Sequence, residues 1–449
     1  MLLQYEHNPY RILITAFTAW KALLLAIAAG SCVGPSYDTS AALLLSEGVS
    51  GSNSSNDSTS PLGLLATRLT SWDAIYFIKA ANRGYLFEQE WAFGAGLPNV
   101  ISAVAKALKR LGLAGSGSSS LEPLVGVTVS HATHLISVLV LYRLGQLIWK
   151  DRKVAFIAAL LHVISPAGLF LSAPYNESPF SCLSFAGYLL LAQGYRLGER
   201  AATQRDILLV LAGCAFGLAT TFRSNGLLNG IPFAYGFLLT SLDLVRRPSA
   251  AACRSLVVLG VGGLCVAAGS LIPQYLAYQS YCSGASGSGG PRRPWCDKLM
   301  PSIYSFVQEH YWNTGFLRYW TVSNVPLFLL AAPMLSVLTR SGIDMLHNVR
   351  EPAEASPEPQ KLSVREGKDL SSLVQCMAAA QVLIAVMTLM SYHVQIINRL
   401  SSGYPVWYWW LAGELIHPSK SSFGSKFVAF MVVYASIQAV LFASFLPPA

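Results

Sequence analysis

The stretch SWDAIYFIKAANRGY, residues 71–85, is a short amphipathic segment in a chain otherwise built of long apolar runs. Side chains at helical spacing gather on one of its faces: Trp72, Ile75, Tyr76 and Lys79. Thr70 or Ser71 can cap its start, so the pattern predicts a helix over 72–83 with Asp73 in the first turn. A helix this short and this amphipathic is expected to lie in the membrane interface and not to cross the bilayer.

The composition places the whole chain in a membrane. Of its 449 residues, 53% are hydrophobic and only 12% are charged, whereas soluble domains carry about 25% charged residues. The alternating segments of about 10 residues that mark a β-barrel are absent. The net charge of +9 is not gathered in a basic soluble module, so we expect no nucleic-acid partner. The composition therefore indicates an all-α polytopic membrane protein.

Apolar runs of spanning length predict about eleven transmembrane helices. The first, 11–31, is long for the core of a signal peptide and no cleavage site follows it, so we expect it to be retained. The other ten predicted spans are 124–149, 154–172, 179–196, 207–222, 226–245, 255–278, 322–339, 373–391, 403–417 and 427–446. The chain is therefore expected to form one integral membrane domain, 1–449.

The distribution of cations predicts which side of the membrane each loop faces. With the N-terminus in the cytosol, the cation-rich loops fall on the cytosolic side: 143–153, 196–205, 246–254 and 340–368. This is the positive-inside bias. It makes 340–372 a cytosolic linker, with a Pro-rich, disordered part at 351–368. It also makes 32–123 and 279–321 lumenal loops, the first holding a second amphipathic helix at 100–111.

Acids on the predicted lumenal side are the candidates for chemistry. A carboxylate at the membrane–lumen boundary can remove a proton from an acceptor hydroxyl, so Asp73 leads as a general base. The alternative is an Asp that only stabilises the first turn of its helix. Glu88 and Glu90 would supply a second acid or hold a metal, unless they are solvated loop acids. Glu177, in a tight turn, would contact substrate or brace the loops.

Isolated cations on the same side require an anionic partner. Arg223 lies in a short loop on the predicted lumenal side, where positive-inside sorting disfavours cations. Arg399, near His393, is a second isolated cation on that side. A lipid phosphate or a carboxylate would satisfy either guanidinium. His393 by itself is more typical of an interfacial or packing histidine than of a catalyst.

Two further features concern the lumenal compartment. Cys282 and Cys296 bracket a Gly/Ser/Pro-rich loop, and a disulfide between them would require an oxidising compartment; whether they are bonded is left open. Asn53 and Asn56 begin glycosylation sequons in the polar stretch 46–60, which favours a lumenal location for that stretch.

Several motifs of soluble transferases are missing. The chain has no P-loop, no Gly-rich dinucleotide loop, no zinc-ligand spacing and no GxSxG motif. A sugar transferred by this chain is therefore expected to come from a lipid-linked donor reached from the membrane.

Five motifs in order along the chain together resemble one family. They are Trp72-Asp73-Ala74 with Gly84-Tyr85, Tyr175-Asn176-Glu177-Ser178, Phe222-Arg223-Ser224-Asn225-Gly226, Gln308 with Tyr311-Trp312-Asn313 and Gly315-Phe316-Leu317, and Asn398-Arg399 with Ser401-Ser402, Pro405 and Tyr408-Trp409. The chain resembles the PIG-V family, GPI mannosyltransferase 2, over nearly its whole length. At 91–98 it reads WAFGAGLP where the family tends to read FAFFPGFP, so the shape of that loop is expected to differ.

The resemblance implies a GT-C type fold in the endoplasmic reticulum membrane. It implies transfer of a second, α-1,6-linked mannose from dolichyl-phosphate mannose to a GPI precursor on the lumenal side, without a cofactor or metal. Asp73 occupies the place of the family's acidic base. A small accessory membrane subunit is left open. Alternatives are another lipid-donor glycosyltransferase, a lipid or sugar transporter, which would predict internal repeats that are not seen, and a non-catalytic pathway scaffold.

The same resemblance, with the aromatic and charged character of the loops, selects the residues expected to bind substrate. They are Trp72, Tyr76, Glu88, Glu177, Arg223, Asn225, Gln308, Trp312, Asn313, His393 and Arg399.

Overall fold

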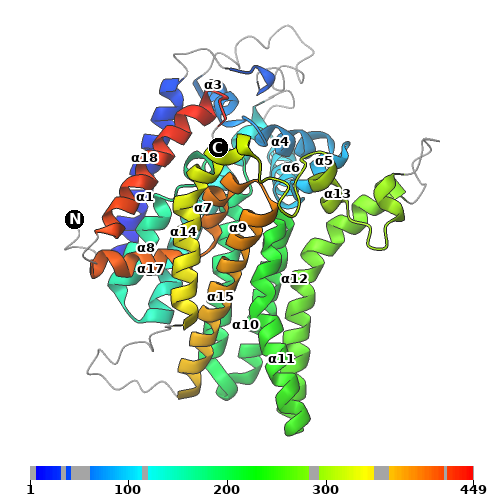
Figure 1. Ribbon diagram of the computed structural model, residues 1–449, viewed down its shortest axis with the longest axis vertical. Coiled ribbons are helices and arrows are strands. Elements are labelled where there is room, and N and C mark those ends of the chain that lie inside the picture. Colours follow the sequence, from blue (N-terminus) through cyan, green and yellow to red (C-terminus); the bar gives the residue numbers. More distant parts are fainter. Residues whose placement is uncertain are drawn as a thin grey trace.

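The computed structural model describes residues 7–31, 37–41, 61–113, 120–282, 293–347, 364–418 and 422–447. Within these ranges every regular element is a helix (Figure 1). The sequons at Asn53 and Asn56 lie outside the described residues.

The α-helices are α1 (Pro9–Gly30), α3 (Pro61–Leu69), α4 (Ala74–Arg83), α5 (Glu88–Ala92), α6 (Gly96–Arg110), α7 (Leu121–Trp149), α8 (Arg152–Val163), α9 (Glu177–Leu197), α10 (Ala202–Phe222), α11 (Ile231–Arg246), α12 (Ala250–Cys282), α13 (Ile303–His310), α14 (Val325–His347), α15 (Val364–Ser391), α16 (Ile397–Leu400), α17 (Val406–Ile416) and α18 (Phe423–Ala443). The 3₁₀ turns used below are η3 (Gly168–Leu171), η5 (Ser224–Gly230) and η6 (Pro294–Asp297).

Eight of the described helical segments are long and apolar enough to cross a membrane. They are α1, α7, α10, η5 with α11, α12, α14 with the turn before it, α15 and α18. The predicted all-α polytopic membrane protein is confirmed, but the predicted count of about eleven spans is not. The other three predicted spans fall on α8 with η3, on α9 and on α17. With 12 and 11 residues, α8 and α17 are well short of the roughly 20 residues that a span requires.

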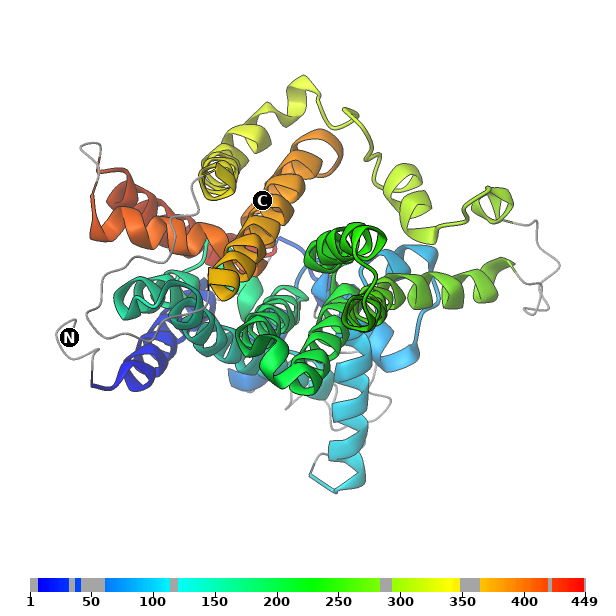
Figure 2. The ribbon, with the colours of Figure 1, turned by 90° about the horizontal axis from the view of Figure 1, so that it is seen from below.

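Short helices form a cap over one end of the long ones. Figure 1 shows α3, α4, α5, α6 and α13 at the top, while α10, α11, α12, α14 and α15 run downward from them. Seen from below in Figure 2, the green α10–α12 group lies next to the orange α15. Two helices of this cap, α4 and α6, correspond to the predicted interfacial helices.

The two predicted interfacial helices have different starts from those expected. The first begins at Ala74 and leaves Asp73 at the N-cap. The second begins at Gly96, four residues earlier than predicted. A Cβ at Gly96 would lie 2.6 Å from the Phe222 ring, and the neighbouring Ala95 N–H donates to the Thr221 carbonyl at 2.9 Å. Contact with the end of α10 therefore determines where α6 begins. The helical pattern within the segment itself does not reveal this contact.

A disulfide fastens the second of the two predicted lumenal segments, 279–321. Cys282, at the end of α12, is bonded to Cys296 in η6, with their Cα atoms 5.6 Å apart. This settles the pairing that the sequence left open. The buried Trp295 beside it donates from Nε1 to Glu88 Oε1 at 2.9 Å, and Tyr311 Oη donates to Glu88 Oε2 at 3.1 Å. Glu88 therefore links the 32–123 and 279–321 segments to each other.

One prediction about the second half of the chain, the length of the linker, is corrected. Helix α14 continues to His347 and α15 begins at Val364, so the linker predicted at 340–372 is confined to residues between these helices, which lie outside the described ranges. Packing between the two helices extends them, since Gln375 Nε2 donates to the Leu346 carbonyl at 3.2 Å. The aromatic run at 404–410 is buried core, because Trp407 and Trp409 are almost completely enclosed.

Candidate active site

Four charged side chains from distant parts of the chain meet beneath the cap. Asp73 precedes α4, Glu177 begins α9, Arg223 follows α10 and Arg399 lies in α16. Arg399 Nη1 lies 3.3 Å from Asp73 Oδ2, and its Nε lies 2.7 Å from Glu177 Oε1. Arg223 Nη1 lies 2.7 Å from the same Glu177 oxygen. Two acids and two guanidinium groups therefore form one continuous, electrically balanced network.

The carboxylate of Asp73 is not used to cap its helix. Although Asp73 occupies the N-cap of α4, its side chain accepts no hydrogen bond from the backbone there. Asp73 also lacks the extended backbone usual at an N-cap, with φ −61° and ψ −23°. The Asp73 side chain therefore makes no capping hydrogen bond, and its carboxylate is paired with Arg399.

The backbone of Trp72 helps to place that carboxylate. Trp72 has a φ of 59°, a left-handed conformation that costs an L-residue about 1–2 kcal/mol. Its ring stacks on Phe445 at a centroid distance of 5.1 Å, which holds the strained residue in place. Trp72 does not line the cavity described below, so its contacts assign it to positioning Asp73 and not to binding substrate.

Arg399 is held on its faces and on one edge. Its guanidinium lies over the rings of Phe170 and Tyr175, 4.2 and 4.9 Å from their centroids, while Nε is bonded to Glu177. Burial alone would lower the pKa of Arg399, but Glu177 and Asp73 raise it, and the net shift is upward. Arg399 is therefore a fixed cation whose Nη1 is directed to Asp73.

Arg223 is held less symmetrically. Beyond its bond to Glu177, its Nε donates to Asn225 Oδ1 at 3.4 Å, and Asn225 Nδ2 in turn donates to Tyr404 Oη at 3.0 Å. Burial lowers the pKa of Arg223, and Glu177 opposes that shift. Arg223 thus contributes a second positive charge on the side of the network opposite Asp73.

Glu177 has a supporting place in this network. Its side chain is 1% exposed and does not line the cavity. One of its oxygens, Oε1, accepts from both arginines. The structure therefore places Glu177, predicted as a substrate-binding residue, behind the cavity wall, where it fixes the two guanidinium groups.

The network opens into a cavity of about 440 Å³. Seven of the predicted site residues line it: Asp73, Arg223, Asn225, Gln308, Trp312, His393 and Arg399. Aromatic and polar side chains that were not selected from the sequence line it as well: Trp91, Phe93, Asn176, Tyr304 and Tyr392. Its remaining wall is mainly apolar and includes Leu227, Leu228, Pro273, Ile384 and Met387.

The structure does not bring all of the predicted residues into this cavity. Tyr76 is 37% exposed and stacks on Phe93 at 4.8 Å. Asn313 has a φ of 47° in the turn after α13. Glu88 is engaged by Trp295 and Tyr311, and neither Glu88 nor its neighbour in α5 is a solvated loop acid.

That neighbour, Glu90, is also buried and paired. Its Oε1 lies 2.6 Å from Arg83 Nη2, and its Oε2 accepts from the Leu86 N–H at 2.8 Å. The solvated-acid interpretation of both residues was wrong because spacing within one loop does not reveal the partners that other loops supply. In the part of the chain that the structure describes, no group of three or more His, Cys, Asp or Glu side chains could hold a metal ion.

His393 lies on the wall of the same cavity as Asp73. It lines the cavity and packs edge-on against Tyr319 at a centroid distance of 4.8 Å. Burial lowers the pKa of His393, and the nearby Asp73 opposes that shift. The packing role expected from the sequence is present, together with a place on the cavity wall.

The turn before α9 supplies a residue that was not selected from the sequence. Asn176 was read as part of a tight turn, yet its side chain is buried and lines the cavity. Its Nδ2 donates to the Phe93 carbonyl at 2.7 Å. Its signal in the sequence is its place in the motif 175–178, whereas the loop that approaches it lies 83 residues earlier.

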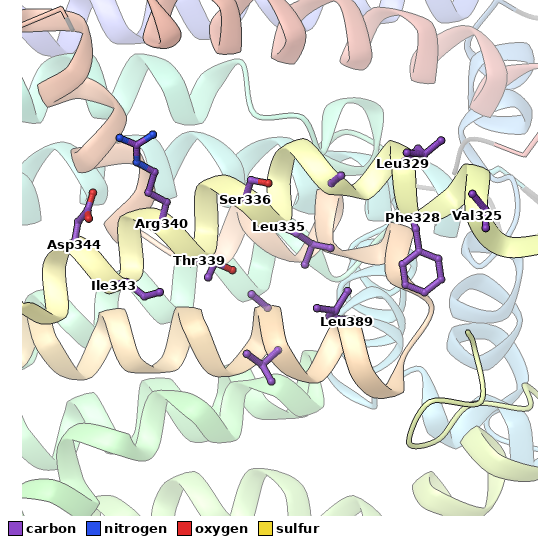
Figure 3. Close-up of a pocket in the computed structure, with 13 residues that line it drawn as sticks. Val325, Phe328, Leu329, Leu335, Ser336, Thr339, Arg340, Ile343, Asp344 and Leu389 are labelled. Carbon is purple, nitrogen blue, oxygen red and sulfur yellow. The ribbon is translucent and has the colours of Figure 1, made fainter. Parts of the chain in front are cut away.

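A second and larger cavity, of about 780 Å³, runs along α14 and α15 (Figure 3). Its wall is almost entirely apolar, with Arg340 and Asp344 close together toward one end. Asp344 Oδ2 accepts from Trp410 Nε1 at 2.9 Å, and Arg340 lies over the Trp410 ring. This groove, hereafter the α14–α15 groove, contains none of the predicted site residues.

Comparison with known proteins gives a consistent result. A family model described as Mannosyltransferase (PIG-V) matches residues 16–449. The chain is 53% identical to GPI mannosyltransferase 2 of Chaetomium globosum over 99% of this chain and 98% of that protein. It is 44% identical to GPI mannosyltransferase 2 of Gibberella zeae over the full length of both. Among solved structures, the oligosaccharyltransferase of Archaeoglobus fulgidus in the apo form is similar with a TM-score of 0.43 and 14% identity, over 96% of this chain and 56% of that one.

Proposed function

The chain belongs to the mannosyltransferase family PIG-V, and we propose that it transfers the second, α-1,6-linked mannose of a GPI precursor from dolichyl-phosphate mannose. The observation that carries this assignment is the pairing of Asp73 with Arg399 in a cavity whose remaining wall is mainly apolar. A base, an anion-binding cation and a lipid-compatible wall are the three elements that such a reaction requires.

Asp73 acts as the general base. It takes the proton from the 6-hydroxyl of the acceptor mannose, and that oxygen attacks C1 of the donor mannose. The bond between C1 and the phosphate oxygen breaks, and its electron pair leaves with dolichyl phosphate. One displacement inverts the configuration at C1. Because the phosphate is a good leaving group, no acid is needed to protonate it.

Arg399 is the better placed of the two arginines to hold the donor phosphate. In the donor the phosphate is bonded directly to the reacting carbon and leaves from the face opposite the attacking hydroxyl, so its cation must lie within about one sugar ring of the base. Both arginines are bonded to Glu177, but Arg399 Nη1 also lies 3.3 Å from Asp73, whereas Arg223 Nε contacts Asn225. A guanidinium held in advance at the departing anion stabilises the charge that develops there. We propose that these cations suffice without a cofactor or metal.

The apolar part of the cavity wall supports a lipid-linked donor. Leu227 and Met387 line the cavity and are 45% and 38% exposed. They lie on segments that are long and apolar enough to cross the membrane. We infer that the cavity opens toward lipid beside α15, where a polyprenyl chain can remain in the bilayer while its phosphate meets Arg399.

The disulfide supports a lumenal site. The bond between Cys282 and Cys296 belongs in an oxidising compartment, and the segment that it fastens contributes Gln308 and Trp312 to the cavity. We therefore place the cavity on the lumenal side of the endoplasmic reticulum membrane and the N-terminus in the cytosol. A small accessory membrane subunit stays a prediction.

Reconstitution with defined substrates tests this function. The purified chain in vesicles receives dolichyl-phosphate [³H]mannose and a GPI precursor with one mannose, and the product linkage is determined. We expect an α-1,6-linked second mannose, no transfer when GDP-mannose replaces the lipid donor, and the same rate in EDTA. Transfer to a different position would contradict the assigned acceptor, and movement of lipid without transfer would favour a transporter.

A further inference from the structure

The amide of Asn176 presents a buried oxygen on the wall of the cavity. The side chain is 3% exposed and lines the cavity. Its Nδ2 is used, donating to the Phe93 carbonyl at 2.7 Å. Its Oδ1 is enclosed and has no hydrogen-bond donor among the residues that the structure describes. Buried amide oxygens in native proteins are nearly always paired, so this one is a candidate to accept a hydrogen bond from a bound molecule.

The surroundings of this oxygen indicate what kind of donor that is. Asn176 lies between Tyr175, whose hydroxyl donates to the Ser71 carbonyl at 3.1 Å, and Glu177, which holds Arg399. The amide is therefore built into the same turn that organises the charged part of the cavity. A group that pairs with Oδ1 would lie beside the reacting atoms.

Two aromatic side chains, Phe93 and Trp312, form part of the same cavity wall. Phe93, whose carbonyl holds the Asn176 amide, packs against Trp312 at a centroid distance of 5.1 Å, and both line the cavity. An amide acceptor beside aromatic rings suits a hexose, because its hydroxyl groups are donors and its C–H faces pack on rings. A phosphate has no such match with Oδ1, since both would be acceptors.

We propose that Asn176 Oδ1 accepts a hydrogen bond from one hydroxyl of a mannose bound between Asp73 and Trp312, and so contributes to sugar specificity. This assignment rests on the proposed mannosyl transfer and adds to it a residue that recognises the ring. The ring is that of the donor or that of the acceptor, because both bring mannose hydroxyls to Asp73. The two sources are separated by the substrates used in the test.

The test measures each enzyme variant with a series of deoxy substrates, each of which lacks one hydroxyl group of mannose. One arm uses dolichyl-phosphate 2-, 3-, 4- and 6-deoxymannose, and the other uses GPI precursors whose terminal mannose lacks its 2-, 3- or 4-hydroxyl. For each variant, kcat/KM with a deoxy substrate is divided by kcat/KM with the parent substrate. Because both values come from one preparation, the fraction of folded protein cancels.

For the wild-type chain we expect one deoxy substrate to react about tenfold more slowly than its parent. In Asn176→Ala, that deoxy substrate is expected to react as fast as its parent. The other deoxy substrates should show the same loss of rate as with the wild-type chain. Asn176→Asp loses the N–H bonded to Phe93 but keeps an acceptor, so it should retain the penalty. This pair of variants separates recognition of the sugar from support of the Phe93 loop.

Asn225→Ala is the matched control. Asn225 is a second amide on the same cavity wall, but its oxygen accepts from Arg223 and its nitrogen donates to Tyr404. In Asn225→Ala, the deoxy substrate that lacks the hydroxyl bound by Asn176 should still react more slowly than its parent, as it does with the wild-type chain. If Asn176→Ala kept every wild-type penalty while the parent reaction proceeded, the assignment of Asn176 would be overturned and the proposed function would stand. If the wild-type chain transferred no mannose from the parent donor, both would fall.

Discussion

The cavity beneath the cap and the α14–α15 groove differ in how their charges are arranged. The groove is the larger, with about 780 Å³ against about 440 Å³. Each contains an acid and an arginine. In the groove, Asp344 and Arg340 both engage Trp410, whereas in the cavity Asp73 faces Arg399, which Glu177 holds in place. Volume alone is therefore a poor guide to chemistry.

The two regions also draw on different lengths of chain. The groove is built from two helices, α14 and α15, and runs along about 19 residues of α14, roughly 29 Å at 1.5 Å per residue. The charged cavity gathers residues from Asp73 to Leu400. Local packing of apolar helices suffices to make a groove, but a reactive site requires convergence of loops that only the complete fold provides.

The carboxylates of the two regions give the largest contrast. Asp73→Asn should reduce mannosyl transfer about a thousandfold, because an amide does not take up the proton of the acceptor hydroxyl. Asp344→Asn should keep the wild-type rate within about twofold, since the amide oxygen still accepts from Trp410. Transfer assays and complementation of cells that lack this activity measure both. Full complementation by Asp73→Asn at normal protein level would refute the assignment of the base.

The arginines give the next contrast. Arg399→Lys keeps the charge but loses the planar group that lies on Phe170 and Tyr175 and bonds Glu177. We expect kcat/KM for the donor to fall about a hundredfold, and Arg340→Lys in the groove to have almost no effect. Steady-state kinetics with varied donor concentration measures the change. Equal losses in the two variants would show that Arg399 has no special relation to the phosphate.

Two positions on α15 test the path of the lipid. Met387 lines the charged cavity and Leu389 lines the groove. Met387→Trp should raise KM for dolichyl-phosphate mannose about tenfold by filling the apolar part of the cavity, whereas Leu389→Trp should leave KM unchanged. A donor with a short lipid chain should be less sensitive to Met387→Trp. The opposite ranking of the two variants would assign the donor chain to the groove.

The disulfide should have the smallest effect on rate. Replacing Cys282 and Cys296 by serine releases a bond between residues 14 positions apart, worth about 3 kcal/mol in a loop of this length. We expect a lower Tm and less than a threefold loss of kcat per folded molecule, because the bond fastens the segment that carries Trp312 without contacting substrate. Cys214 and Cys265, unbonded with sulfur atoms 3.8 Å apart, provide the control double substitution. An unchanged Tm for the Cys282/Cys296 variant would contradict this role.

Much of the site could be selected from the sequence, but not the roles of its members. Seven predicted residues line the cavity, because isolated charges and amides in lumenal loops of an apolar chain have few structural uses there. Glu88 and Glu177 were selected for the same reason, yet they brace other residues. Asn176 belongs to a motif quoted above but was not selected, because its contact with the Phe93 loop joins residues 83 positions apart.

The amino-acid sequence by itself determined the helical membrane class, since an apolar run must satisfy its backbone hydrogen bonds within a helix when no water is present. It also determined which polar residues lie in the loops outside those runs. Only the tertiary structure decided that Arg399 meets Asp73, 326 positions away, and that Glu177 supports both arginines. Such pairings depend on how α4, α9, α10 and α16 come together, and no local pattern in the chain contains that information.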